Sequence, residues 1–592
     1  MCGIAGELRL DGRSPELGVM DRMLAQLERR GPDHCGSWSD GPLQFGHRRL
    51  AIIDLSARSH QPMVDPGLGL AVVFNGTLYN YPQLREELGR RGHTFFSGGD
   101  TEVILKAYAE WGEACVEQFD GMFAFALWET AGRRLFLARD RMGIKPLYYT
   151  VDHDGLRFAS NTQALLAAGG IDTAPDPVAL HYQFTLHGVV PGPRTVVAGI
   201  RKLPPATTLT IGPDGEQRQR TYWHLSQRSR LEFGSEAEGV EAVHEALRAA
   251  VAKRRTVADV PVGVLLSGGL DSSLLVGLLH EAGESDVQTF SIGFEDVAGE
   301  AGSEFEYSDV VAECFGTRHH RMHIPNGEVL PRLPEAIERM PEPMFGQDAV
   351  AFYLLAERVS REVKVVLSGQ GADEVFGGYF WYHQIAADPE GDAAERLARY
   401  YFDRDHDEYR RLVTERFRGP DHTRAWIEHQ LAALGESDPV AAVLALDPTQ
   451  LVVEDPVKRV DSMTMAWGLE ARVPFLDHRL VETAAELPAE LRLRDGGKYP
   501  LKAMARGLVP DSVIDRPKGY FPMPALKYVR GEFLDFMRDT LNSRAARERG
   551  IFEPAYIDQL LDAPEEHHTR IQGSKLWHVA LFEAWWQRHI DG

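Results

Sequence analysis

The sequence predicts a two-domain protein of the α/β and α+β classes, with a β-rich first domain and a parallel sheet in the second. At 592 residues the chain is several times the size of a typical domain, so two separate cores are expected. Short alternating segments such as 70–74 and 122–128 are broken by Gly, Asn and Asp, as in strands joined by tight turns. Apolar runs at 262–266, 287–294 and 363–367 alternate with longer helical patterns, which indicates parallel strands covered by helices.

Helices are predicted where apolar residues recur with helical spacing. At 81–91, Leu84 and Leu88 lie four residues apart on one face of a helix that should cover a sheet. Another helix is predicted at 240–254, and from residue 393 onward the pattern is mainly helical. The C-terminal third is therefore expected to be a helical addition to an α/β core.

A polar stretch divides the chain. The composition turns polar at 226–238, which predicts a linker between domains. We therefore place the first domain at residues 2–215 and the second at 236–592.

The composition excludes several classes of function. The 87 acidic side chains outnumber the 64 basic ones, and the net charge of -23 repels nucleic acid and anionic membrane surfaces. Small molecules are the expected partners, and homo-oligomer formation stays open. Four cysteines without a CxxC pair indicate neither a disulfide scaffold nor a zinc ribbon. No apolar run approaches the roughly 18 residues of a membrane span, and we expect a cytoplasmic protein.

The second residue is a cysteine that can carry its own base. After removal of Met1, Cys2 has both a thiol and a free α-amine, whose pKa of about 8 lets it accept the thiol proton. The alternative is that Cys2 is a small apolar residue at the start of a strand.

The segments that surround Cys2 in sequence decide between these alternatives. They are CGIAG at 2–6, RRGPD at 29–33, HRRLAIIDL at 47–55, FNGTLYN at 74–80, GGDTEV at 98–103 and GMFAFALW at 121–128. Together they resemble the class II glutamine amidotransferase domain. This resemblance implies the four-layer αββα fold of Ntn hydrolases, with Cys2 as the nucleophile that releases ammonia from glutamine.

The same resemblance implies roles for further residues. Arg49 corresponds to the guanidinium that binds the α-carboxylate of glutamine, and Asp100 to the partner of its α-ammonium. Asn75 and Gly76 correspond to the oxyanion donors, although an Asn-Gly pair taken alone is more often a turn. Thr77 stands where related asparagine synthetases usually carry glutamate, so one polar contact near glutamine differs.

A glycine-rich loop, SGGLDSS, follows the apolar run at 262–266 and precedes a helical pattern. Gly268 and Gly269 let the backbone approach an anion at the start of that helix. The loop adds three hydroxyl donors, Ser267, Ser272 and Ser273. It resembles the PP-loop of ATP pyrophosphatases, which split ATP into AMP and pyrophosphate, whereas a Walker A motif is absent from the sequence.

A second loop, SGQGADEVFGGY, follows the apolar run at 363–367 and contains Asp373. Asp271 of the first loop and Asp373 would face each other across the ends of parallel strands, where ligands usually bind. Two carboxylates with phosphate oxygens make a site for Mg²⁺. The alternative for Asp373 is a helix cap.

The PP-loop resemblance also assigns residues outside the two loops. Leu265 and Ile292 are implied to contact adenine through the backbone, and Lys502 to stabilise the activated acyl group. Arg516 and Lys518 are implied to contact pyrophosphate, with solvated surface charge as the alternative. The full predicted ATP-binding set is Leu265, Ser267, Gly268, Gly269, Asp271, Ser272, Ile292, Ser368, Gly369 and Gln370.

A third block, DSMTMAWGLEARVPFLDH at 461–478, extends the resemblance to the whole chain, which is similar to the asparagine synthetase B family. The implied reaction activates a carboxylate with AMP and loss of pyrophosphate. Ammonia then passes through a channel in the protein and forms an amide.

Two departures from that family concern the acceptor. Gln370 replaces a loop glutamate that is proposed to manage the amine proton, and glutamine cannot act as a base. Ser462 stands where many members carry a basic residue near aspartate, and Lys458 and Arg459 are the nearest replacements.

Segments 455–478, 363–379, 515–529 and 573–587 closely resemble the N-acetylglutaminylglutamine amidotransferase branch, which amidates an acylated dipeptide used as a compatible solute (an osmoprotectant). Three aromatic residues are available to line a larger, less charged acceptor pocket, Tyr379, Phe380 and Trp381. Aspartate stays the alternative acceptor.

Three other functions are less compatible with the sequence. A non-catalytic homologue would be expected to have lost Cys2 or a loop carboxylate, and a glutaminase alone would not need SGGLDSS. A metal hydrolase would use His319, His320 and His323, which lack paired ligands elsewhere, so a solvated turn is expected there.

Overall fold

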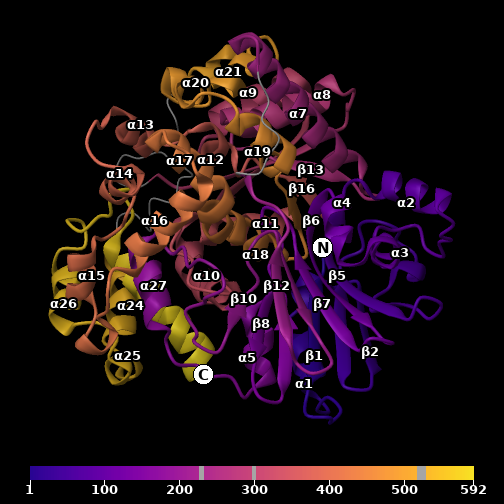
Figure 1. The fold of residues 1–592 in the computed structure, drawn as a ribbon. Coiled ribbons are helices and arrows are strands. Elements are labelled where there is room, and N and C mark those ends of the chain that lie inside the picture. The colour runs from indigo at the N-terminus through magenta and orange to yellow at the C-terminus, as the bar shows by residue number, and fades with distance from the viewer. Residues whose placement is uncertain (226–232, 297–301, 517–528) are drawn as a thin grey trace.

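The computed structural model describes residues 1–225, 233–296, 302–516 and 529–592 (Figure 1). Within these residues the chain forms two antiparallel sheets of six strands each and a parallel sheet of five strands. This arrangement confirms the predicted fold class. Part of the predicted linker, 226–232, lies outside the described residues, and the proposed domain limits stay a prediction.

The first half of the chain is a sandwich of the two antiparallel sheets. The first sheet has, in spatial order, β10 (Arg201–Lys202), β8 (Tyr148–Val151), β9 (Gly155–Ala159), β1 (Gly3–Arg9), β3 (Leu43–Arg49) and β2 (His34–Asp40). The second has β12 (Gln217–Thr221), β11 (Thr207–Ile211), β7 (Arg134–Arg139), β6 (Gly121–Glu129), β5 (Leu70–Leu78) and β4 (Met63–Asp65). Alternating side chains of the two sheets, such as Ile4, Phe45, Val73 and Trp128, form the core between them.

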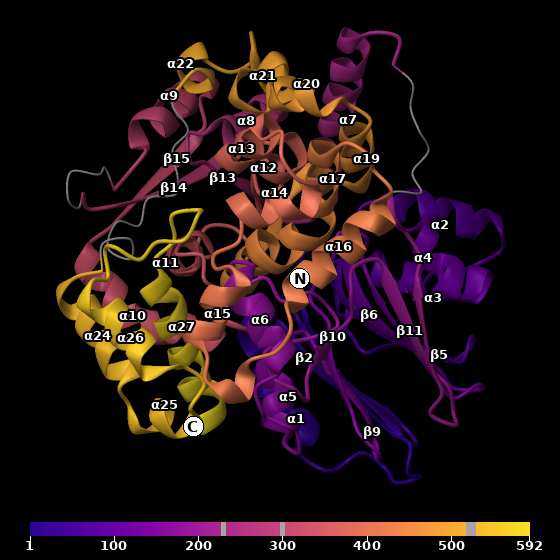
Figure 2. The ribbon, with the colours of Figure 1, turned by 60° about the vertical axis from the view of Figure 1, so that its left-hand side comes forward.

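Helices cover both outer faces of the sandwich (Figure 2). Apolar residues of α1 (Val19–Ala25) and α5 (Thr162–Ala168) pack beneath the first sheet. Those of α2 (Tyr81–Arg90) and α3 (Thr101–Trp111) cover the second sheet, where Leu84 and Leu88 are buried as predicted. The layers therefore run helix, sheet, sheet, helix, as the four-layer αββα expectation required. Two more helices complete this half, α4 (Cys115–Gln118) and α6 (Pro177–Thr185).

The second half is built on the parallel sheet, in the order β15 (Arg318–Ile324), β14 (Gln288–Phe294), β13 (Val262–Leu265), β16 (Val365–Leu367) and β17 (Glu470–Arg472). The helices before and around it are α7 (Glu236–Thr256), α8 (Leu270–Glu281), α9 (Phe305–Phe315), α10 (Asn326–Arg339), α11 (Asp348–Val359), α12 (Ala372–Phe376) and α18 (Lys458–Met465). Since β13 and β16 are neighbouring parallel strands, the two loops that follow them meet at one edge of the sheet.

The C-terminal part is mainly helical, as predicted. Its helices are α13 (Phe380–Ala387), α14 (Ala393–Tyr400), α15 (His406–Leu412), α16 (His422–Leu434), α17 (Pro439–Leu446), α19 (His478–Ala485), α20 (Ala489–Leu493), α21 (Tyr499–Ala505), α22 (Asp511–Ile514), α24 (Gly531–Leu541), α25 (Arg544–Arg549), α26 (Pro554–Asp562) and α27 (Lys575–Trp586). Among the described residues, no helix combines the length and apolar character needed to cross a membrane.

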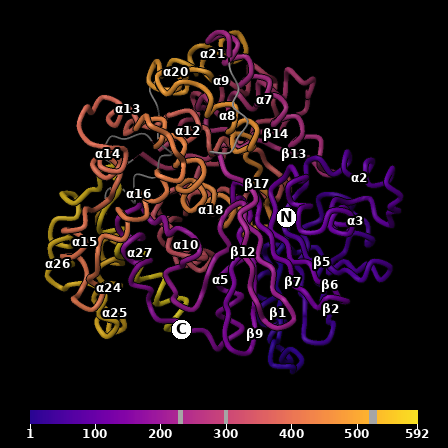
Figure 3. Tube along the Cα trace, viewed as in Figure 1, coloured from indigo at the N-terminus to yellow at the C-terminus, as the bar shows by residue number. Residues whose placement is uncertain are grey.

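Two strands of the parallel sheet are corrections to the sequence-based prediction. The histidines at 319, 320 and 323 lie in β15 and not in a solvated turn, because RHHRMHI pairs along its whole length with β14. Strand β17 interrupts the helical part and pairs with β16. It brings the 461–478 block beside the N-terminus of the chain (Figure 3).

Candidate active sites

Cys2 lies immediately before β1 at the inner end of a small cavity. Its side chain is buried, and its backbone N–H donates to Asn75 Oδ1 at 3.0 Å. Burial raises the pKa of the Cys2 thiol, whereas the N-terminal ammonium, the Leu50 backbone and Arg49 act to lower it. The buried thiol therefore depends on nearby positive charge for activation.

The cavity at Cys2 contains three of the four predicted glutamine-binding residues, Arg49, Gly76 and Asp100, whereas Asn75 is not among its lining residues. Its lining residues are Met1, Cys2, Arg49, Leu50, Ile52, Ile53, Ser59, Gln61, Phe74, Gly76, Thr77, Asp100, Thr101 and Glu470. The Arg49 guanidinium is held by the carbonyl oxygens of Ser56 (3.0 Å) and Ile53 (3.3 Å). Burial raises the pKa of the Asp100 carboxyl to about 6, although it accepts a hydrogen bond from Leu78 N.

The predicted oxyanion donors lie on β5 next to the nucleophile. The Asn75 side chain is fully buried, and its Nδ2 has no hydrogen-bond acceptor among the described residues. A buried amide N–H without an acceptor costs free energy in the free protein. It can therefore donate to the negative charge that develops on the substrate oxygen during the reaction. Gly76 lines the cavity, and a Cβ atom there would come within 2.3 Å of Met122 O.

Glu470 is a residue of this cavity that the sequence-based prediction missed. It belongs to β17 of the parallel sheet, and its carboxylate pairs with the Met1 ammonium at 2.9 Å. Arg472 Nε lies 2.6 Å from the same carboxylate. The available signal was a Glu and an Arg two residues apart in an otherwise apolar segment, which places both on one side of a strand.

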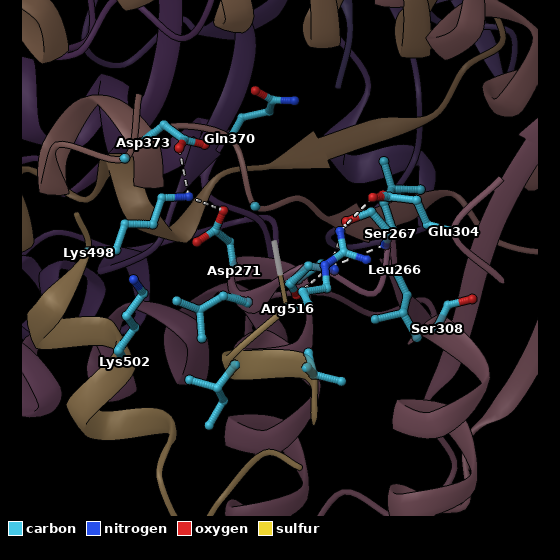
Figure 4. A pocket seen from close by; sticks show the side chains of 18 of the residues that line it. Leu266, Ser267, Asp271, Glu304, Ser308, Gln370, Asp373, Lys498, Lys502 and Arg516 are labelled. Carbon is cyan, nitrogen blue, oxygen red and sulfur yellow. Dashed lines mark hydrogen bonds and ion pairs between the residues drawn. The ribbon is translucent and has the colours of Figure 1, made fainter. Parts of the chain in front are cut away.

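The second site is a cavity of about 820 Å³ at the ends of β13 and β16 (Figure 4). Nine of the ten predicted ATP-binding residues line it, namely Leu265, Ser267, Gly269, Asp271, Ser272, Ile292, Ser368, Gly369 and Gln370. The volume is near the upper end of the roughly 300–1,000 Å³ range of ligand pockets. It leaves room for an acceptor beside a nucleotide.

Gly268 does not line the cavity but shapes the loop that does. Its φ of +72° is a left-handed conformation, and a Cβ atom there would come within 2.5 Å of Ser308 N. The turn places Gly269 at the N-cap of α8, so the free N–H groups of that helix face the cavity.

We expect Gly268→Ala to raise the KM for ATP by about 10- to 100-fold, because the loop must shift away from α9 and the backbone loses its left-handed geometry. Steady-state kinetics with ATP as the varied substrate checks this. Hydrolysis of glutamine should remain within about twofold of normal, and an unchanged KM for ATP would contradict the prediction.

Asp271 and Asp373 face each other as predicted, and a lysine lies between them (Figure 4). Lys498 Nζ is 2.6 Å from Asp271 and 2.8 Å from Asp373. Burial opposes the charged form, but the two carboxylates raise the pKa of Lys498 well above its usual value. Asp373 lies in the first turn of α12 without capping it, since no side chain caps that helix.

Lys498 is the second residue that the sequence-based prediction missed. Lys502, the predicted lysine, lines the same cavity one helical turn further on and donates to Asp495 O. Lys498 follows Gly496 and Gly497 and has a positive φ of 58° itself. A lysine directly after two glycines and before a helix was the usable signal, because such a turn directs a side chain into a crevice.

Of the two predicted pyrophosphate contacts, the structure describes only Arg516, since Lys518 lies outside the described residues. Arg516 lines the cavity and pairs with Glu304 at 2.6 Å. Its guanidinium carbon also lies over the Tyr307 ring, 4.4 Å from the ring centroid. The charge is therefore held inside the site and is not a solvated surface charge.

Apart from Gln370, the residues predicted to define the acceptor pocket do not line the 820 Å³ cavity. Ser462 and Lys458 face a separate small cavity between the two halves, and Lys458 pairs with Glu342 and Glu454. Arg459 is paired with Asp348 at 2.9 Å. Neither cation is therefore available as a replacement contact.

The three aromatic residues also pack elsewhere. Tyr379 stacks on Trp381 with ring centroids 4.1 Å apart, and its hydroxyl donates to Glu374 at 2.7 Å. Phe380 lies edge-on to Trp381. These aromatic side chains belong to the hydrophobic core of the helical region, which explains their presence without a ligand.

The histidines of β15 have structural partners. His319 Nδ1 lies 2.8 Å from Thr289 Oγ1, and His320 stacks on Phe290. The described residues contain three groups of His, Asp or Glu with ligand atoms within 4.8 Å of one another, and none includes a β15 histidine. A metal-hydrolase site built on these histidines is therefore not supported.

Comparisons with known proteins match both halves of the chain. The glutamine amidotransferase domain model matches residues 1–223, and the asparagine synthase model matches residues 242–587. Asparagine synthetase [glutamine-hydrolyzing] 1 from Bacillus subtilis (strain 168) is 31% identical, and the match covers 100% of this chain and 97% of the relative. Asparagine synthetase [glutamine-hydrolyzing] 3 from the same organism is 33% identical, with 95% of this chain and 93% of the relative covered. A putative asparagine synthetase [glutamine-hydrolyzing] from Mycobacterium tuberculosis (strain ATCC 25618 / H37Rv) is 33% identical over 98% and 95%.

The matches follow the order of the two halves, and the relatives align from end to end. The first half holds a buried cysteine ahead of a β-sandwich, and the second holds paired carboxylates at the ends of parallel strands. The chain therefore belongs to the asparagine synthetase family and is a glutamine-dependent carbon–nitrogen ligase.

Proposed function

We propose that the chain hydrolyses glutamine at Cys2 and uses the ammonia to amidate a carboxylate that it has activated as an acyl adenylate. The observation that carries this proposal is the shared strand pair β16 and β17. Glu470 of β17 lines the cavity at Cys2, and Ser368, directly after β16, lines the nucleotide cavity and donates its N–H to Arg472 O of β17. The two cavities thus lie at opposite ends of this strand pair, since Glu470 begins β17 and Ser368 follows the end of β16.

At the first site, removal of Met1 frees the α-amine of Cys2, which then takes the thiol proton. Arg49 and Asp100 bind the two ends of glutamine's amino-acid group, and Asn75 Nδ2 with the Gly76 N–H stabilises the oxyanion. The unpartnered buried Nδ2 supports this assignment. Hydrolysis of the resulting acyl-enzyme then returns the free thiol.

At the second site, Asp271 and Asp373 are the residues that would hold Mg²⁺. Their fit is supported by the cation already between them, Lys498, and by Gly378, where a Cβ atom would come within 2.1 Å of Asp373 Oδ1. The ion would neutralise phosphate charge. The α8 N-terminus and Arg516 bind the leaving pyrophosphate, and Lys498 stabilises negative charge on the acyl adenylate.

For the acceptor we propose N-acetylglutaminylglutamine. The resemblance of four sequence blocks to that branch supports it, as does Gln370, a neutral side chain that lines the cavity. Aspartate is the second candidate, because the relatives named above are asparagine synthetases. Tyr379, Phe380 and Trp381 do not support the dipeptide as the acceptor, because they pack in the hydrophobic core.

We expect N-acetylglutaminylglutamine to be amidated with a kcat/KM about 10- to 100-fold above that of aspartate. Gln370 presents a neutral side chain to the acceptor, and each charge-assisted hydrogen bond that aspartate lacks there costs about 1.5–3 kcal/mol. Both acceptors are compared with saturating ATP, Mg²⁺ and glutamine, with amide formation followed by mass spectrometry. Equal or better use of aspartate would overturn the acceptor proposal and leave the two-site mechanism in place.

A further inference from the structure

Glu470 belongs to the synthetase half but reaches into the cavity where glutamine is proposed to bind. Glu470 is the first residue of β17 and lies in register with Val365 of β16. Its side chain is 0% exposed and lines the same cavity as Cys2, Arg49 and Asp100. Burying an unpaired carboxylate costs folding free energy, so the groups that pair with Glu470 indicate its role.

The two oxygens of Glu470 have different surroundings. Oε1 accepts a hydrogen bond from Arg472 Nε at 2.6 Å and faces Thr77 Oγ1 at 3.4 Å. Arg472 is itself buried, which fixes the carboxylate in one orientation. Oε2 points to the Met1 ammonium at 2.9 Å, and both groups are fully enclosed. The cavity therefore has a place for a primary ammonium group beside Glu470.

Asp100 supplies a second carboxylate in the same enclosed space. It is 6% exposed and lines the cavity with Glu470. Two ionised carboxylates buried at one cavity repel each other unless a cation lies near both. Removal of Met1 takes away the ammonium that now lies beside Glu470 and leaves an amine on Cys2, whose N already donates to Asn75 Oδ1. The ammonium of a substrate can therefore take the vacated place beside Glu470.

We infer that Glu470 is a substrate-positioning residue of the glutaminase site, supplied by the synthetase half, which pairs with the α-ammonium of glutamine together with Asp100. This inference rests on the proposed glutaminase role of Cys2. Thr77 lines the cavity without bringing a charge to it. The Glu470 carboxylate, within 3.4 Å of Thr77 Oγ1, supplies a negative charge at that place.

Glu470→Gln removes the charge and keeps the size of the side chain. Its glutaminase kinetics are measured with glutamine and with glutaramate, the same amide without the α-amine. We expect kcat/KM for glutamine to fall about 10- to 100-fold, mainly through KM, and that for glutaramate to change less than twofold. Synthesis from free ammonia should continue, because the nucleotide site is untouched.

Glu454→Gln is the matched control, since Glu454 is another buried synthetase carboxylate that pairs across the domain contact, with Lys202 at 2.6 Å. It should leave the ratio of glutamine to glutaramate unchanged. Adding Thr77→Glu to Glu470→Gln should restore a large part of the preference for glutamine. Glu470→Asp, which keeps the charge on a shorter side chain, should give an intermediate ratio and replaces Glu470→Gln where that variant does not fold.

An equal loss on both amides, or an unchanged KM for glutamine, would overturn this inference and leave the proposed function standing. Absence of glutaminase activity in the unaltered, Met1-processed protein would instead overturn the proposed function, and this inference with it.

Discussion

Replacement of Cys2 by serine or alanine is expected to abolish glutamine-dependent synthesis, with a loss of about 10³-fold or more, while synthesis from free ammonia continues. The serine hydroxyl is a far weaker acid than the thiol, and the α-amine cannot deprotonate it effectively at neutral pH. The second cavity contains none of the residues that line the first, so ATP use with ammonia should be within about twofold of normal.

The measurement is amide formed from glutamine and from ammonium chloride at saturating ATP and acceptor. Cys35 is an exposed cysteine of the same half and Cys35→Ser is the matched control, expected to change neither rate. Loss of both rates in the Cys2 variants would contradict two separate sites. Intact-mass analysis is part of the test: active protein that retains Met1 would refute the α-amine as the base, since Cys2 N is then an amide that donates to Asn75.

The local chemistry of each site could be predicted from the sequence, because it depends on residues that are neighbours in the chain. Cys2 ahead of a strand, the glycine loop after β13 and the acidic loop after β16 are each contained in a short segment. The meeting of the glycine loop and the acidic loop at one edge of the sheet also follows from the sequence, since neighbouring parallel strands have their carboxyl ends on the same side. The structure has Asp271 and Asp373 close enough for one Lys498 ammonium to contact both.

Contacts between distant segments could not be predicted in this way. Glu470 acts at the N-terminus only because three residues form β17 within a helical region, and strand pairing of that length has no periodic signature. Strand β15, RHHRMHI, was not predicted because its residues are mostly polar and lack the apolar pattern of a buried strand. Such residues are tolerated in β15 because it lies at the edge of the sheet. Ser462 was assigned by its position in a motif and Tyr379 as an available aromatic residue, whereas packing directs both side chains elsewhere.

The small cavity that Ser462 lines is bordered by residues of both halves, which buried ion pairs connect. Lys202 of the first half lies 2.6 Å from both Glu342 and Glu454, and Asp461 binds Arg30 and Lys145. Such buried pairs contribute little net stability, but breaking one leaves an uncompensated charge. They therefore fix the register of the two halves, and with it the position of Glu470 at Cys2.

Lys498→Met is expected to lower amide formation from glutamine and from ammonia alike, by about 10²- to 10³-fold, which is typical for loss of one group that stabilises developing charge. The Lys498 ammonium lies between the two loop carboxylates and is held there by a left-handed backbone. Methionine keeps the length of the side chain but removes the ammonium that both carboxylates contact and that would stabilise negative charge on the acyl adenylate. Hydrolysis of glutamine at Cys2 should persist.

Lys502→Met is the matched comparison, because Lys502 lines the same cavity and was the lysine predicted from the sequence. Burial lowers the pKa of Lys502, and its ammonium donates to a backbone carbonyl and not to a loop carboxylate. We therefore expect a loss of about tenfold or less, seen mainly in KM. AMP and pyrophosphate are measured beside the amide in both variants. A larger loss for Lys502→Met than for Lys498→Met would assign the charge-stabilising role to Lys502. Formation of ADP and phosphate would refute adenylation of the acceptor carboxylate, whichever lysine is replaced.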